Sequence, residues 1–221
     1  MTIFRISVCM LAVLALAATS HADIDVGEVT DGEPGAVFEQ LFPPPLGNPF
    51  GPEDSVGSDN FQSDNLFGFN ELQEFTLTEP LSVDMLVDGA GGLAPGVLPA
   101  GTTVASHYIF FDSKELKSVQ GNVRFDQDIL AVITTEVDLD NSDFLGHPSV
   151  HYISKFLRGL EGDTVTWSGP NEITVSFTTA TPGDYIRVLT EVPEPSTLLM
   201  ASMFAVCMAG AGRWRRKRSS S

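Results

Sequence analysis

Cysteine and basic residues are scarce in this chain of 221 residues. Its two cysteines, Cys9 and Cys207, lie in apolar segments near the ends, so the central part offers neither a disulfide framework nor a cysteine metal site. Residues 23–195 hold all 29 acidic residues but only six of the twelve basic ones, which gives this stretch a net charge of −23. Because such a surface repels phosphate groups, we expect no nucleic-acid partner.

Enzyme signatures are also missing. The sequence contains no Gly-x-Ser-x-Gly, no His-Glu-x-x-His, no phosphate-binding loop and no Rossmann fingerprint. The central part has no cysteine that could act as a nucleophile. A pair of carboxylates for glycoside hydrolysis remains open, since two such residues can meet only in the folded chain. We therefore predict that the chain is not an enzyme, with polysaccharide hydrolysis as the alternative.

The first 22 residues, MTIFRISVCMLAVLALAATSHA, have the parts of a signal peptide. Arg5 supplies the positive charge near the start, and Val8–Ala18 is an apolar run of eleven residues, too short to cross a bilayer. Small residues occupy the two positions that a signal peptidase recognises before the cut. The pattern predicts a signal peptide helix in residues 1–22, with cleavage between Ala22 and Asp23.

The C-terminal segment, residues 192–221, has the features of a second targeting signal. An uncharged run of fifteen residues, Leu198–Gly212, precedes a basic cluster made of Arg213, Arg215, Arg216, Lys217 and Arg218. As a helix this run would be about 22 Å long, against a hydrocarbon core of about 30 Å, so flanking residues must extend it to make a single transmembrane helix. The positive-inside rule places the basic cluster in the cytoplasm and the acidic stretch outside.

A proline-containing motif stands directly before this apolar run. It consists of Val192, Pro193, Glu194, Pro195, Ser196 and Thr197. Its two prolines fix φ and oppose helix formation, so they hold an extended segment just outside the membrane. The motif, the short apolar helix and the arginine cluster, in this order at the C-terminus, resemble the PEP-CTERM sorting signal of bacterial exosortase substrates. The terminal Ser219, Ser220 and Ser221 are a small departure from that pattern.

The resemblance implies a route for the protein. A membrane-embedded exosortase would recognise the motif, cut near it and pass the protein from the inner membrane to the cell surface or the extracellular polysaccharide. The alternative is a plain C-terminal anchor that is never cut. The run from VASHYIFFD to PGDYIRVLT also resembles a β-rich domain found in PEP-CTERM proteins, which implies a β fold and export and adds no chemistry.

Between the two ends, the sequence predicts a spacer and one domain. Residues 27–65 hold six prolines and six glycines, so we interpret residues 23–65 as a Pro/Gly-rich spacer. Apolar residues in it, such as Phe38 and Leu41, leave open that part of it docks on the domain. Residues 66–191 follow as the β-sandwich domain.

Period-two patterns dominate this domain. EITVSFT places Ile173, Val175 and Phe177 on one face of a strand, and LSVDMLV at 81–87 alternates in the same way. TVASHYIFF at 103–111 is apolar on both faces, which is typical of a central strand. Strands separated by Pro-Gly and Gly-Asn turns predict an all-β fold, an antiparallel β-sandwich of jelly-roll-like type. Only SKELKSVQ and SKFLRGLE favour short helical turns.

Candidate ligand-binding residues are few. Asp138, Asp140 and Asp143 form an acidic cluster that we interpret as a solvated loop. It is a weak calcium candidate, although it lacks the glycine and the final glutamate of an EF-hand loop. We expect no other cofactor and no catalytic residue. The histidines, His107, His147 and His151, are interpreted as structural or surface residues. Trp167, Tyr108, Tyr152 and Tyr185 are interpreted as core residues, with sugar stacking as the alternative.

These patterns lead to one functional prediction with two alternatives. We expect an exported protein of the cell surface or extracellular matrix, structural or adhesive in role, processed by signal peptidase and an exosortase. The first alternative is a secreted polysaccharide-binding module, with or without calcium. The second is the polysaccharide hydrolase.

Overall fold

Strands make up most of the folded chain. The computed structural model describes residues 21–43, 55–57, 60–87, 93–153, 157–180 and 183–193. In chain order the elements are β1 (Ile24–Asp31), β2 (Phe38–Leu41), β3 (Ser55–Val56), β4 (Leu66–Asn70), β5 (Phe75–Thr76), β6 (Leu81–Val87), β7 (Leu93–Leu98), β8 (Thr103–Phe111), β9 (Lys117–Phe125), β10 (Ile129–Ile133), α2 (Glu136–Asn141), η2 (Asp143–Leu145), β11 (His151–Tyr152), β12 (Thr164–Gly169), β13 (Glu172–Thr179) and β14 (Asp184–Glu191). Because helix within these ranges is limited to short pieces such as α2 and η2, the predicted all-β class is confirmed.

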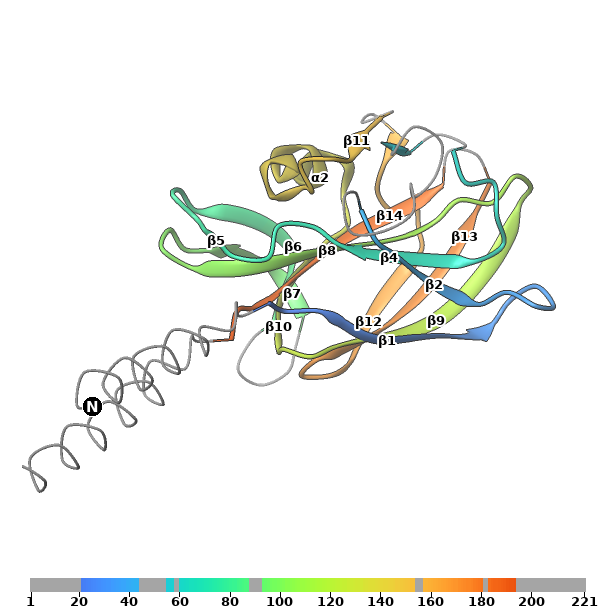
Figure 1. The fold of residues 1–221 in the computed structure, drawn as a ribbon, viewed down its shortest axis with the longest axis horizontal. Coiled ribbons are helices and arrows are strands. Elements are labelled where there is room, and N and C mark those ends of the chain that lie inside the picture. Colours follow the sequence, from blue (N-terminus) through green and yellow to red (C-terminus); the bar gives the residue numbers. More distant parts are fainter. Residues whose placement is uncertain are drawn as a thin grey trace, which may run out of the picture. The chain divides into compact units, whose positions relative to one another are not determined.

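The described strands form two main sheets (Figure 1). The small sheet has the order β1-β9-β13-β12, and the large sheet runs β2-β4-β8-β14-β10-β6-β7, with β5 paired to β8. Both are antiparallel, except that β2 lies parallel to β4. A short parallel pair of β3 and β11 stands apart from them.

An apolar core lies between the two sheets. On β13 the side chains of Ile173, Val175 and Phe177 are buried in it, while the alternating residues are more exposed. Ile109 on β8 and Val188 on β14 belong to the same cluster, so both sheets contribute to it. The period-two pattern of EITVSFT therefore identified the buried face of this strand correctly.

A second core covers the opposite face of the large sheet. The segment with α2, η2 and β11 lies on that side, away from β1 and β9 (Figure 1). Aromatic rings from β4, β8, β11 and β14 pack in this core, and the ring centroids of Tyr108 and Tyr152 lie 5.4 Å apart. Because β8 lies between the small sheet and this helical layer, its residues from Val104 to Phe111 are buried on both faces. The prediction of a central strand at 103–111 is confirmed.

The prediction of a spacer at 23–65 is wrong for much of its described length. β1 is the edge strand of the small sheet, and β2 extends the large sheet beside β4. Gly27 shows why composition misled: a Cβ at this position would overlap the ring of Phe38. Glycine at this point allows close packing of β1 on β2 and does not indicate looseness. Residues His21–Val192 form one compact unit, which includes this segment.

The helical segments also differ from the prediction. The second half of SKELKSVQ, residues 117–120, is the start of β9, and part of SKFLRGLE, at 154–161, lies outside the described residues. The helix α2 forms instead in the acidic segment that the sequence suggested as a loop. Thr135 caps it, because the Oγ1 of Thr135 accepts a hydrogen bond from the backbone N–H of Asp138 at 3.4 Å.

The predicted terminal helices fall outside the described residues. This applies to the signal peptide up to residue 20 and to the apolar run at 198–212. Among the residues that the structure describes, no helix is both long and apolar enough to cross a membrane.

Candidate functional site: a buried ion cluster and an aromatic pocket

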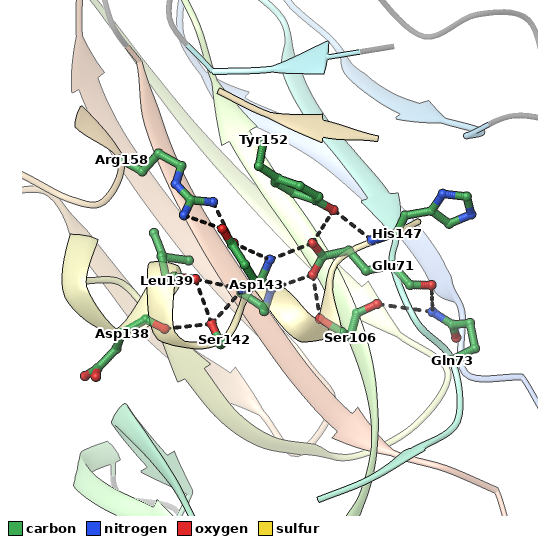
Figure 2. Close-up of polar contacts among 11 residues, drawn as sticks. Glu71, Gln73, Ser106, Asp138, Leu139, Ser142, Asp143, His147, Tyr152 and Arg158 are labelled. Atoms are coloured by element: carbon green, nitrogen blue, oxygen red, sulfur yellow. Dashed lines mark hydrogen bonds and ion pairs between the residues drawn. The ribbon is translucent and has the colours of Figure 1, made fainter. Parts of the chain in front are cut away.

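A cluster of charged and hydroxyl groups is buried between the large sheet and the helical layer (Figure 2). Its centre is Glu71, which follows β4, and Arg187 on β14; their side chains are fully buried. Arg187 donates to Glu71 twice, from Nε to Oε2 at 2.6 Å and from Nη2 to Oε1 at 2.8 Å. This bidentate geometry is the strongest form of a carboxylate–guanidinium pair.

Two hydroxyl groups complete the environment of the Glu71 carboxylate. Tyr152 on β11 donates its hydroxyl to Oε1 at 2.5 Å, and Ser106 on β8 donates to Oε2 at 2.5 Å. Burial, and next the charge of Glu71, raise the pKa of Tyr152 well above its ordinary value, so this hydroxyl stays protonated as a donor. Each oxygen of Glu71 therefore accepts two hydrogen bonds.

The remaining hydrogen-bond donors of Arg187 contact the layer formed by α2 and η2. Its Nη1 donates to the Ser142 hydroxyl at 2.6 Å and to the carbonyl of Leu139 at 3.1 Å, and its Nη2 lies 3.4 Å from Oδ1 of Asp143. Burial opposes the charge of Arg187, but the adjacent Glu71 carboxylate outweighs burial and raises the pKa of Arg187 above its ordinary value. A single guanidinium thus connects β14 to the end of α2 and the start of η2.

A second ion pair closes the cluster. Arg158 donates to both oxygens of Asp143, from Nη1 at 2.9 Å and from Nη2 at 3.0 Å. The guanidinium carbons of Arg158 and Arg187 lie 5.9 Å and 5.8 Å from the ring centroid of Tyr152. Burial raises the pKa of Tyr108, beneath Arg187, to about 12. The four charges of the cluster cancel, as buried charges must in a low-dielectric interior.

This arrangement is suited to holding layers together. Both oxygens of Glu71 are saturated, and the carboxylate is shielded from solvent, so a substrate cannot reach it as a nucleophile or an acid. We infer a structural role for the cluster. Sequence reasoning missed it, although an arginine within the apolar strand DYIRVLT is a signal of a buried partner.

The three weak calcium candidates are not arranged around one point. Asp143 is engaged by Arg158 and Arg187, and Asp140 lies 3.8 Å from Arg158. Asp138 lies beside Asp84, and burial followed by the charge of Asp84 raises the pKa of Asp138. Within the described ranges, no group of three acidic, histidine or cysteine residues is placed to hold a metal ion.

The histidines have structural or surface positions. His107 is buried, with Nδ1 2.7 Å from Oδ1 of Asn70 and Nε2 3.0 Å from the hydroxyl of Thr190. Burial lowers the pKa of His107 to about 3, so the ring is neutral. His147 accepts the backbone N–H of Ser149 at 3.2 Å, and His151 is exposed on β11. These contacts agree with the structural interpretation.

Three of the four aromatic residues expected in the core are found there. Tyr108 and Tyr185 are buried, and Tyr152 packs against them. Trp167 is half-buried on β12, on the side of the buried Val165. Because Tyr108 and Tyr185 are buried, they cannot stack on a sugar.

A different aromatic pair is exposed in a pocket. A pocket of about 500 Å³ lies between α2, β5 and β6, and it is lined by Phe75, Thr78, Glu79, Pro80, Leu81, Ser82, Asp138, Asn141 and Phe144. The rings of Phe75 and Phe144 have centroids 5.3 Å apart, and Phe144 remains 48% exposed. Asp138 and Asn141, one helical turn apart on α2, add a carboxylate and an amide. Four apolar residues and five polar or charged ones line this pocket, so it offers both a stacking surface and hydrogen-bonding groups.

Few of the predicted processing residues can be placed. Ala22 is buried, and Asp23 directly precedes β1. Val192 and Pro193 follow the end of β14. The remaining sorting residues, Glu194, Pro195, Ser196 and Thr197, and the basic residues Arg213, Arg215, Arg216, Lys217 and Arg218 lie outside the described residues.

The chain has no match among known proteins in three comparisons. No family model matches it, and neither does any curated protein or any solved structure. The function therefore has to be inferred from the residues themselves.

Proposed function

We propose that this chain is an exported protein of the cell surface or extracellular matrix, structural or adhesive in role and sorted through a PEP-CTERM signal. The observation that carries the proposal is the position of the folded unit. β1 begins at Ile24, one residue after the first residue of the predicted mature chain, and β14 ends at Glu191, just before the sorting motif. Cleavage at both predicted sites would remove no strand.

The processing enzymes and the route belong to the same proposal. Signal peptidase would cut after Ala22, and an exosortase would cut near Val192, after the transmembrane helix has held the protein in the inner membrane. The net negative charge of the domain would keep it soluble after its release from the membrane. The signal-peptide helix, the transmembrane helix and the jelly-roll-like form of the sandwich are further parts of this proposal.

The intact mass of the protein from the envelope and the medium of its native cells tests the proposal. We expect a species that begins at Asp23 and ends close to Pro195, with or without an attached group. A variant with alanine at Pro193, Glu194 and Pro195 should keep its basic tail. A native protein that begins at Asp23 but retains residues 213–221 would refute exosortase processing.

The aromatic pocket favours one alternative, binding to extracellular polysaccharide. The ring of Phe144 can stack on the apolar face of a sugar, and Asp138 and Asn141 can bond its hydroxyl groups. The acidic surface makes a neutral polymer the better partner, since it would repel an anionic one.

Binding to neutral glucan beads and to matrix polysaccharide from the native cells tests this alternative. Phe144→Ala should weaken retention roughly tenfold, which corresponds to the loss of about 1.4 kcal/mol from one aromatic contact. Val137→Ala is the control, because Val137 is exposed on α2, next to Asp138, and does not line the pocket. Equal retention of both variants would refute the site. Loss of retention in the presence of a chelator would show that binding depends on calcium. Release of reducing sugar would favour the hydrolase, and Glu79 and Asp138 are the carboxylates that line this pocket.

A further inference from the structure

The first residue of the predicted mature chain is bonded to a carboxylate. The backbone nitrogen of Asp23 donates to Oδ1 of Asp126 at 2.8 Å, and the backbone N–H of Asp126 donates to the carbonyl of Asp23 at 3.1 Å. Asp126 directly follows β9, the neighbour of β1 in the small sheet. The nitrogen that a cut after Ala22 would release therefore already lies against an acidic side chain.

Neighbouring contacts fix this nitrogen in place. The side-chain amide of Asn70 donates to Oδ1 of Asp23 at 2.8 Å, and Oδ1 of Asn70 accepts the backbone N–H of Ile24 at 3.3 Å. The side chain of Ile24 is buried in the core between the sheets. The start of β1 is thus held by the core on one side and by Asn70 and Asp126 on the other.

The local charge is negative. The carboxylates of Asp23, Asp25 and Asp126 lie near the start of β1, and Arg124 pairs with Asp25 at 2.8 Å. Among the described residues Asp126 has no ion-pair partner of its own. Partial burial, and then the charges of Asp23 and Asp25, raise the pKa of Asp126. An added positive charge at this point would lower the free energy of the cluster.

We propose that Asp126 receives the α-ammonium group that cleavage after Ala22 creates on Asp23. Hydrolysis of the Ala22–Asp23 bond adds one water, leaving a carboxylate on Ala22 and an ammonium on Asp23. The amide hydrogen bond to Asp126 then becomes a charge-assisted one, which is shorter and stronger. The inference rests on the proposed export and its cleavage position. Since Ala22 is buried in the folded chain, the cut would come during translocation, before folding.

This ion pair exists over a defined pH range. An ordinary α-amino group has a pKa of about 7.7–8.0, and pairing with Asp126 raises it. Because the folded-state pKa of the amine is raised, its contribution is present at lower pH and is lost as pH rises through that pKa. At acid pH the contribution is lost when Asp126 takes up a proton. The other groups facing this point are the carboxylates of Asp23 and Asp25 and the guanidinium of Arg124.

The test uses protein expressed with its own leader and recovered after export. Its α-amine is labelled by reductive methylation with ¹³C and titrated by NMR. The expected pKa lies at least about half a unit above the ordinary α-amine range. Asp126→Asn should return it to that range, whereas Asp128→Asn, an equal charge change on the same turn, should leave it raised. A glycine inserted after Ala22 moves the amine by about 3.8 Å and should also abolish the shift.

The intact mass of the same samples separates the two possible failures. A mature chain that begins at a residue other than Asp23 overturns the cleavage position and this inference with it. A chain that begins at Asp23 but has an ordinary α-amine pKa, unchanged by Asp126→Asn, overturns the inference alone and leaves the proposed export intact.

Discussion

Replacement of Glu71 by glutamine should strongly destabilise the folded unit. Glu71→Gln keeps the size of the side chain but removes the charge that neutralises Arg187, which is fully buried. Breaking a buried ion pair by changing one partner costs about 3–5 kcal/mol, because the other charge stays buried without compensation. Since whole domains are stable by only about 5–15 kcal/mol, this is a large part of the total.

Urea unfolding of the exported protein, followed by near-ultraviolet circular dichroism, measures this loss. With a slope of about 2 kcal/mol per molar urea, the midpoint should fall by roughly 1.5–2.5 M. Tyr152→Phe is a milder variant, because it removes one hydroxyl hydrogen bond to the carboxylate, at about 1.5–3 kcal/mol. This variant keeps the test informative if Glu71→Gln does not fold.

A double variant distinguishes an ion pair from general packing damage. Glu71→Leu with Arg187→Met replaces both charges by apolar groups, so it should be more stable than Arg187→Met alone. A midpoint shift below about 0.5 M for Glu71→Gln would refute the reasoning. So would a loss of stability in the double variant that equals the sum of the losses in the two single variants.

Two further predictions concern other parts of the sandwich. Burial, followed by the neighbouring Asp163, raises the pKa of Asp184 to about 8, so the wild type should lose stability as pH rises from about 4 to about 8. Asp184→Asn should remove this pH dependence, so the melting temperature of the variant minus that of the wild type should increase as pH rises over this range. A difference that stays constant would contradict the prediction. Gly121→Ala should destabilise the small sheet by at least about 1 kcal/mol, because a Cβ there would lie 2.6 Å from the carbonyl oxygen of Glu28. The melting temperature and the hydrogen-exchange protection of the amides between β1 and β9 measure this loss. A variant in which both are unchanged would contradict the prediction.

Local patterns predicted the strands that have one wet face or two buried faces. Residues 103–111 and 172–179 were identified because period two and β-branched content act within a few residues. The role of residues 24–41 was missed, because its glycines suggested a loop. The packing of Phe38 on Gly27 depends on two strands from different sheets, so the composition of the segment cannot predict this contact.

The buried cluster was beyond sequence reasoning for a similar reason. Glu71 and Arg187 are 116 residues apart, and only the sheet order brings them together. The sequence showed an arginine in an apolar strand but gave no means to choose its partner among many carboxylates. The acidic segment at 136–143 was misjudged as a loop, since its role as a capped helix depends on Thr135 and on Leu139, which is buried beneath it.

Most of the few basic residues in the central part of the chain form ion pairs in the folded structure. Four of the six basic residues in the central part are engaged in ion pairs with specific carboxylates: Arg187 with Glu71, Arg158 with Asp143, Arg124 with Asp25 and Lys117 with Asp64. The two arginines in the buried cluster contribute no charge to the surface. Because the buried cluster is neutral, the net negative charge of residues 23–195 is carried by the other residues, which disfavours an anionic polymer as a partner. An α-ammonium at Asp23 would add one cation to this small set, at a point where three carboxylates gather. The proposed binding of a neutral polysaccharide at the Phe144 pocket is consistent with this acidic surface.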